Sequence, residues 1–177
     1  LGAARAGFRS PGRRALIAIA NALPGRPPVV VGLALYVVLY SPVVMAADTP
    51  ENYAQHMAAF QFIRDVPTDW QDTRVLNGEI GDYVTIAREA RGGQDWFLGA
   101  VGDEQARNLT VKLDFLDPGK TYVAQIYRDA ADADYRTDKR HAIVIESRKV
   151  TAADTLALAI APGGGQAIRF VAPRGKK

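Results

Sequence analysis

Cysteine is absent from this sequence of 177 residues, and histidine occurs only twice. The absence of cysteine excludes a disulfide framework, a zinc knuckle and a thiol nucleophile. The two histidines fall in different predicted elements, and no serine stands in a G-x-S-x-G context, which argues against a serine triad. The sequence also contains no P-loop and no internal repeat. We therefore predict that the chain carries no catalytic site of its own.

Acidic residues are missing from residues 1–28, which hold five arginines, and the final segment 174–177 is also basic. Between these two ends the acidic side chains outnumber the basic ones, although the net charge is +3. The surplus basic residues lie at the two ends of the chain without a regular spacing, and Phe8 is the one aromatic residue among them. Nucleic-acid binding is therefore not expected. We predict an atypical, disordered basic leader over residues 1–28 and a basic tail over residues 174–177.

Residues 27–47 contain no charged residue of either sign. The length of this run is near that of a transmembrane helix, and its flanks resemble a secretory signal with its cleavage site. Ser41 and Pro42, however, divide it into a helical part, Leu33–Tyr40, and a short β-like part, Val43–Ala46. A buried helix followed by a buried parallel strand has the same composition. The residues alone leave these interpretations open.

A single helix is predicted next. Thr49 is placed to cap it, Pro50 suits its first position, and the helix should end before Pro67. Apolar residues at helical spacing give it one apolar face, formed by Tyr53, Met57, Phe60 and Ile63. His56 lies beside that face and is expected to be a packed side chain.

The apolar period changes to two after Trp70, which predicts strands separated by glycine-containing turns. The predicted strands are Arg74–Glu79, Tyr83–Arg88, Asp95–Val101, Leu109–Phe115, Thr121–Arg128, Ala142–Ser147, Thr155–Ile160 and Ala167–Val171. So many short strands in succession are typical of an antiparallel β-sandwich. The predicted fold class is therefore mainly β.

The most acidic loop contains Asp129, Asp132, Asp134 and Asp138. It does not fit an EF-hand, because Arg136 and Thr137 stand where that loop needs a ligand and a glycine. We predict a solvated hairpin loop without a metal. The triplet Gly163–Gly165 leads from one strand to another and lacks the helix N-terminus that would hold a phosphate.

Two tryptophans, Trp70 and Trp96, are candidates for a sugar-stacking platform like that of a carbohydrate-binding module. A sandwich also needs large rings for its core, so packing is the alternative role. The sequence leaves both roles open.

A resemblance to a known family covers roughly residues 33–171. The stretch that begins LALYVVLYSPVVMAADTPENYAQHMAAF, the segment YVAQIYRDAADADY and the closing GGGQAIRF resemble the C-terminal end of glycoside hydrolase family 97. Members of this family are α-glucosidases and α-galactosidases with an N-terminal β-sandwich, a catalytic (β/α)₈ barrel and a C-terminal all-β domain.

The resemblance implies a domain division. Residues 29–67 would be the C-terminal end of the barrel, with two helices and a short strand, and residues 68–173 would be the C-terminal sandwich of about eight strands. The uncharged run would then lie in the barrel interior, so a membrane span is not expected. Detached from the remaining barrel, this run and the helix after it would lose most of their packing partners.

The resemblance also implies a mechanism that uses a pair of carboxylates and a bound calcium ion. No position of this chain matches those catalytic residues or calcium ligands, so no cofactor is expected in this chain. Asp48 and Glu51 alone would lie near the mouth of the barrel, where active sites of that fold are built. Helix capping is the alternative role for both.

The resulting hypothesis is a C-terminal portion of a bacterial α-glycosidase, inactive alone and acting in structure and oligomerisation. Its implied partners are the remainder of the barrel and a second copy of the chain, with α-linked oligosaccharides for the full-length enzyme. The implied location is periplasmic or secreted. The alternative is a secreted or membrane-tethered β-sandwich binding module without enzymatic activity.

Overall fold

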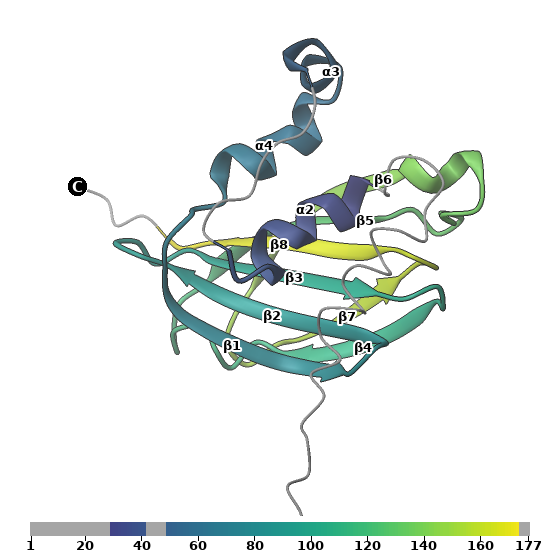
Figure 1. Ribbon diagram of the computed structural model, residues 1–177. Helices are drawn as coiled ribbons and strands as arrows, with labels where there is room; N and C mark the ends of the chain where they lie inside the picture. The colour runs from purple at the N-terminus through teal and green to yellow at the C-terminus, as the bar shows by residue number, and fades with distance from the viewer. Residues whose placement is uncertain (1–28, 42–48, 174–177) are drawn as a thin grey trace, which may run out of the picture.

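The computed structural model describes residues 29–41 and 49–173, and within them eight strands form two antiparallel sheets (Figure 1). The strands are β1 (Trp70–Glu79), β2 (Tyr83–Ala90), β3 (Trp96–Gly102), β4 (Arg107–Lys112), β5 (Tyr122–Asp129), β6 (Ile143–Val150), β7 (Thr155–Ile160) and β8 (Gly165–Val171). Six strands form one sheet in the order β1-β2-β3-β8-β5-β6, and β4 pairs with β7. The predicted antiparallel β-sandwich is confirmed.

The predicted strand boundaries hold best where the alternation is cleanest. The strand Thr155–Ile160 matches its prediction at both ends. Strand β1 begins earlier than predicted, at Trp70, because irregular pairing near Asp72 lets the strand continue along β2 although its alternation is lost. Strand β4 ends earlier, and the buried Leu113 begins a turn in which its carbonyl accepts from the N–H of Leu116 at 2.9 Å.

The main core lies between the two sheets. Alternate residues of each strand point into it, as the period of two requires. The largest side chains that fill it are Trp96, Leu98, Leu113, Phe115, Tyr122, Leu156, Leu158, Ile168 and Phe170. Burial of this apolar area is the main stabilising contribution to the sandwich.

A second core lies on the outer face of the six-stranded sheet, beneath helix α2 (Val29–Val38). The helix can approach closely because Gly99 of β3 has no side chain: a Cβ there would stand 2.6 Å from the carbonyl oxygen of Ala34. Strand β3 is consequently buried along its whole length, with β4 and β7 on one side and α2 on the other. The expectation that this segment loses its packing partners is wrong for residues 29–38, where Val31, Leu33 and Val37 are at most 2% exposed.

The single helix predicted after Thr49 is two helices, α3 (Pro50–Gln55) and α4 (Met57–Asp65). The break falls at His56, whose φ of −128° and ψ of 38° are not helical. Pro50 does occupy the first turn. The backbone carbonyl of Thr49, and not its side chain, satisfies that turn by accepting from the N–H groups of Asn52 and Tyr53.

The apolar face predicted for this helix is also corrected. Ala59 and Phe62 are the buried residues of α4, whereas Met57 is 44% exposed. His56 is exposed and not packed. The tertiary contacts decide this, because α4 docks on the sheet through Phe62. The predicted strand Val43–Ala46, the leader and the tail lie outside the described residues, and no helix within the described residues is long and apolar enough to cross a membrane.

Candidate interaction surface

The outer face of the six-stranded sheet carries a cluster of aromatic rings. Phe97 of β3 lies at its centre and is 1% exposed. Phe62 of α4 contacts it edge-on with ring centroids 5.9 Å apart, and Trp70 contacts it edge-on at 5.7 Å. Tyr127 of β5 contacts Phe62 at 5.2 Å. Edge-to-face contacts of this kind give α4 a defined orientation on the sheet.

A guanidinium fastens α4 to the same face. Arg169 of β8 binds the carboxylate of Asp65 at 2.6 Å and that of Asp95 at 2.8 Å, and it lies over the ring of Phe97. The side chains of the three charged residues are between 18% and 24% exposed, so water screens these ion pairs less than surface pairs. Asp95 also accepts from the N–H of Ala172, which ties the end of β8 to the start of β3.

A second guanidinium on this face lies between two aromatic rings. Arg88 of β2 is 3% exposed and stacks with Trp70 at 5.5 Å and with Tyr40 at 5.8 Å. Burial lowers the pKa of Arg88, and its Nε has no hydrogen-bond partner within the described part of the chain. The aromatic contacts therefore replace the ion pair that a buried arginine usually has.

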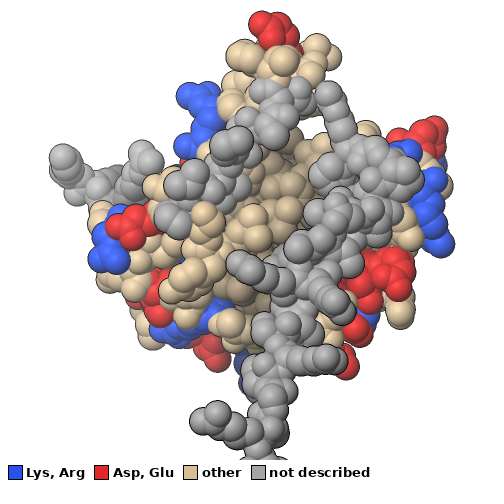
Figure 2. Space-filling view, viewed as in Figure 1, with Lys and Arg blue, Asp and Glu red and all other residues tan. Residues whose placement is uncertain are grey.

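Several exposed apolar side chains lie on the helix-covered side of the sheet, toward its two edges. Val75 of β1 is 66% exposed, Val123 of β5 39% and Ile145 of β6 41%, while Tyr40 is 90% exposed. The register places Val75, Val123 and Ile145 on the same side of the sheet as α2. Figure 2 shows that the charged side chains visible on this face lie mainly toward its rim. Such a surface fits contact with another protein surface better than contact with a charged ligand.

The predicted site residues are not brought together. Asp48 lies outside the described residues, and Glu51 is exposed in the first turn of α3. Trp70 packs on Phe97 and Arg88 in the outer cluster. Trp96 is 3% exposed in the main core, on the opposite side of the sheet, and contacts Phe115 at 5.0 Å. The two tryptophans therefore do not form one platform.

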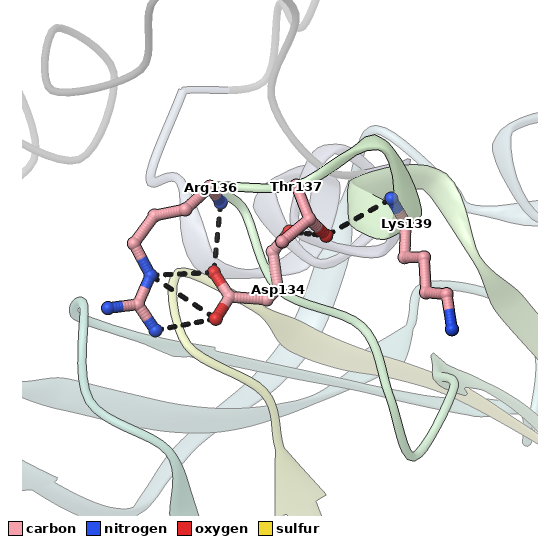
Figure 3. Close-up of polar contacts among 4 residues, drawn as sticks. All are labelled: Asp134, Arg136, Thr137 and Lys139. Atoms are coloured by element: carbon pink, nitrogen blue, oxygen red, sulfur yellow. Dashed lines mark hydrogen bonds and ion pairs between the residues drawn. The ribbon is translucent and has the colours of Figure 1, made fainter.

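The acidic loop differs from its prediction at one residue. Asp134 and Asp132 are held by Arg136 and Lys139, with ion pairs of 2.5 Å each, and Figure 3 shows Arg136 turned toward Asp134 while the Lys139 ammonium points away from it. The hydrogen bond from Arg136 lowers the pKa of Asp134 to about 2. Asp129, in contrast, is not solvated: it is 5% exposed at the end of β5.

Asp129 is buried because it binds the turn that contains the glycine triplet. The N–H of Gly165 donates to Oδ2 of Asp129 at 2.8 Å, and the N–H of Ala161 donates to the same oxygen at 3.4 Å. Burial raises the pKa of Asp129 to about 6, and the two N–H donors partly oppose that rise. The Gly163–Gly165 turn therefore does bind an anionic group, but the group is a carboxylate of the same chain.

Calcium does not fit the described residues. No three His, Asp or Glu side chains within residues 29–41 and 49–173 come together as a metal site. The acidic loop, which has the highest density of carboxylates, uses Asp132 and Asp134 in the ion pairs given above. No reaction step is assigned to a metal in this part of the chain.

Sequence reasoning missed Arg88, Arg169 and the role of Asp129. One signal was available: Arg169 interrupts an apolar strand between Ile168 and Phe170, so it points to the opposite face from a core position. The partner of Arg169 could not be inferred, because Asp65 and Asp95 are distant in sequence.

Two packed antiparallel sheets, with helices packed on one outer face, define this chain as a β-sandwich domain. This chain belongs to glycoside hydrolase family 97: the family described as glycosyl-hydrolase 97 C-terminal, oligomerisation, matches residues 69–171. The match begins just before β1 and ends with β8, so it covers all strands of the sandwich.

Relatives with known names agree with this family. A retaining α-galactosidase of Bacteroides thetaiotaomicron is 37% identical over 78% of this chain and 20% of its own length. A probable retaining α-galactosidase of Streptomyces bingchenggensis is 33% identical over 75% of this chain. A solved family 97 enzyme of Pseudoalteromonas sp., in complex with acarbose, is 50% identical with a TM-score of 0.81, over 84% of this chain and 23% of its own. The chain thus spans only about a fifth of the length of these enzymes.

Proposed function

We propose that this chain is the C-terminal portion of a bacterial α-glycosidase, in which it serves packing and assembly and not bond cleavage. The observation that carries the proposal is the second core, in which α2 and α4 lie on the outer face of a sandwich that matches the family's oligomerisation domain. Arg169 and its two carboxylates support this role, since they fix the helices before the sandwich to the strand that ends it.

The full-length enzyme is proposed to hydrolyse α-glucosides or α-galactosides. Relatives support each of the two substrate classes. Two are named as α-galactosidases, and another was solved with acarbose and with panose. A periplasmic or secreted location, and calcium bound outside the described residues, belong to the same proposal and rest on the family. Cell fractionation and metal analysis of the full-length enzyme test these two points.

The test of the proposal combines two measurements on the purified 177-residue chain. Light scattering over a range of concentrations is expected to show an oligomer, and the chain is expected to leave p-nitrophenyl α-glucoside and α-galactoside intact. Glycoside hydrolysis needs two carboxyl groups held at a fixed separation across the bond, and no position of this chain was matched to the catalytic carboxylates of the family. Hydrolysis of either substrate, or a mass that stays monomeric at every concentration, would contradict the proposal.

A further inference from the structure

The outer edge of strand β6 is unpaired in the described part of the chain. β6 is the last strand of the six-stranded sheet, opposite β1 at the other end (Figure 1). Its residues from Ile145 to Lys149 are exposed. Its register with β5 runs without a shift over all eight residues, whereas β1 has two irregularities in its pairing. β6 is therefore the longer regular edge open to another strand.

The direction of the backbone groups follows from the register. The N–H of Ala130 donates to the carbonyl of Ala142, so this pair is hydrogen-bonded across the two strands. Hydrogen-bonded pairs alternate with non-bonded pairs in an antiparallel ladder. The N–H and C=O groups of Ile143, Ile145, Ser147 and Lys149 consequently point away from β5. These groups form a row that a second antiparallel strand could bind.

We propose that β6 pairs with β6 of a second copy of this chain, antiparallel and centred on Ser147, to join two six-stranded sheets. This inference rests on the oligomerisation proposed above and names the surface that performs it. Ser147 of each copy would face Ser147 of the other, and Ile145 would face Lys149, so every outward backbone group near the centre would meet a partner.

Charge selects this register. With the two-fold axis at Ser147, Glu146 lies opposite Arg148 of the second copy, and Arg148 lies opposite its Glu146. Both pairs fall at non-hydrogen-bonded positions, where opposing side chains are closest. A two-fold axis one residue earlier would place Glu146 against Glu146, and one residue later Arg148 against Arg148, which like-charge repulsion disfavours.

The side chains needed for these pairs are available. Glu146 is 48% exposed and binds Arg128 of its own chain at 3.0 Å, and a carboxylate has acceptor sites for a second donor. Arg148 is exposed, and its charge already helps to lower the pKa of Glu146 in its own chain. In the dimer Glu146 would thus lie between Arg128 and the arginine of the second copy. The methylene groups of Lys149 would cover Ile145, which is 41% exposed here.

Charge reversal on the full 177-residue chain tests the proposal, with the dimer dissociation constant measured by sedimentation. Glu146→Arg and Arg148→Glu each turn two attractive pairs into repulsive ones, so we expect each to raise the dissociation constant about tenfold or more. The double variant Glu146→Arg/Arg148→Glu restores opposite charges and is expected to return the constant close to that of the unaltered chain. Glu79→Arg, the matched control on the edge strand β1, should leave it unchanged. Circular dichroism of each variant verifies that the fold is intact.

Amide exchange gives a second measurement. The amide hydrogens of Ile145, Ser147 and Lys149 are expected to exchange more slowly as the chain concentration rises, since only the second copy can protect them. A dimer that is insensitive to the single reversals, is not restored by the double variant or is weakened equally by Glu79→Arg overturns the β6 pairing and leaves the oligomerisation itself standing. A chain that is monomeric throughout overturns both.

Discussion

The Nη1 atom of Arg169 in the last strand lies 2.6 Å from Oδ2 of Asp65 at the end of α4, and both side chains are about four-fifths buried. This contact joins the helical segment to the sandwich across about a hundred residues of chain. The same guanidinium binds Asp95, so one side chain fixes two segments. The helices and the sandwich are therefore expected to unfold together.

Removing the carboxylate of Asp65 tests this coupling. Asp65→Asn loses a charge-assisted hydrogen bond in a mostly buried site, so we expect the free energy of unfolding to fall by about 2 kcal/mol. Amide exchange in α4 should accelerate more than in the strands. The matched control is Asp72→Asn, which breaks the exposed pair with Arg74 and should cost less than about 1 kcal/mol. Equal losses in the two variants would contradict the coupling.

A methyl group at Gly99 should separate α2 from the sheet. The added Cβ would stand 2.6 Å from the carbonyl oxygen of Ala34, which belongs to the helix backbone and cannot rotate away. We expect Gly99→Ala to lower the free energy of unfolding by about 1–3 kcal/mol. Gly93→Ala is the control, because its Cβ would have no neighbour closer than 3.9 Å. Unfolding in urea measures both, and an unchanged midpoint for Gly99→Ala would be inconsistent with the packing described.

Asp129 should make stability depend on pH in the opposite sense from a salt-bridged carboxylate. Its folded-state pKa of about 6 lies above the ordinary aspartate pKa of 3.8, so between these pH values the folded chain binds more protons than the unfolded one. This group's contribution is therefore most favourable below about pH 4 and is lost as the pH rises through about 6.

The variant Asp129→Asn cannot ionise, and its side-chain oxygen can still accept from Gly165. Its free energy of unfolding, relative to the unaltered chain, should rise by up to about 3 kcal/mol between pH 4 and pH 7. Glu104→Gln, at an exposed position, serves as the control. Unfolding curves at several pH values give the comparison, and a difference that stays constant with pH would refute the assignment.

The buried guanidinium of Arg88 should be dispensable for stability. Arg88→Met keeps an unbranched side chain between Trp70 and Tyr40 and removes a desolvated charge, so the free energy of unfolding should stay the same or increase. Arg88→Ala loses the packing as well and should be destabilising. A large loss of stability in Arg88→Met would show that the charge has a stabilising partner.

The sequence alone determined the strands and the family. Alternation from Trp70 onward, with glycine-rich turns between the segments, identified all eight strands, because the side-chain period of a strand is a local property. The uncharged segment before them was equally compatible with a membrane span, a signal or buried elements, and only the resemblance to family 97 favoured burial. The sequence did not predict the helix break at His56 or the burial of Asp129.

Only the tertiary structure decided the strand order and the contacts that follow from it. Placing β8 between β3 and β5 brings Arg169 next to Asp95, and it brings the glycine turn beside Asp129. The same strand order aligns Gly99 and Gly165 under α2, so the helical part of the uncharged segment packs against the sandwich. These pairings join residues far apart in the chain, and local periodicity carries no information about which distant strand becomes a neighbour.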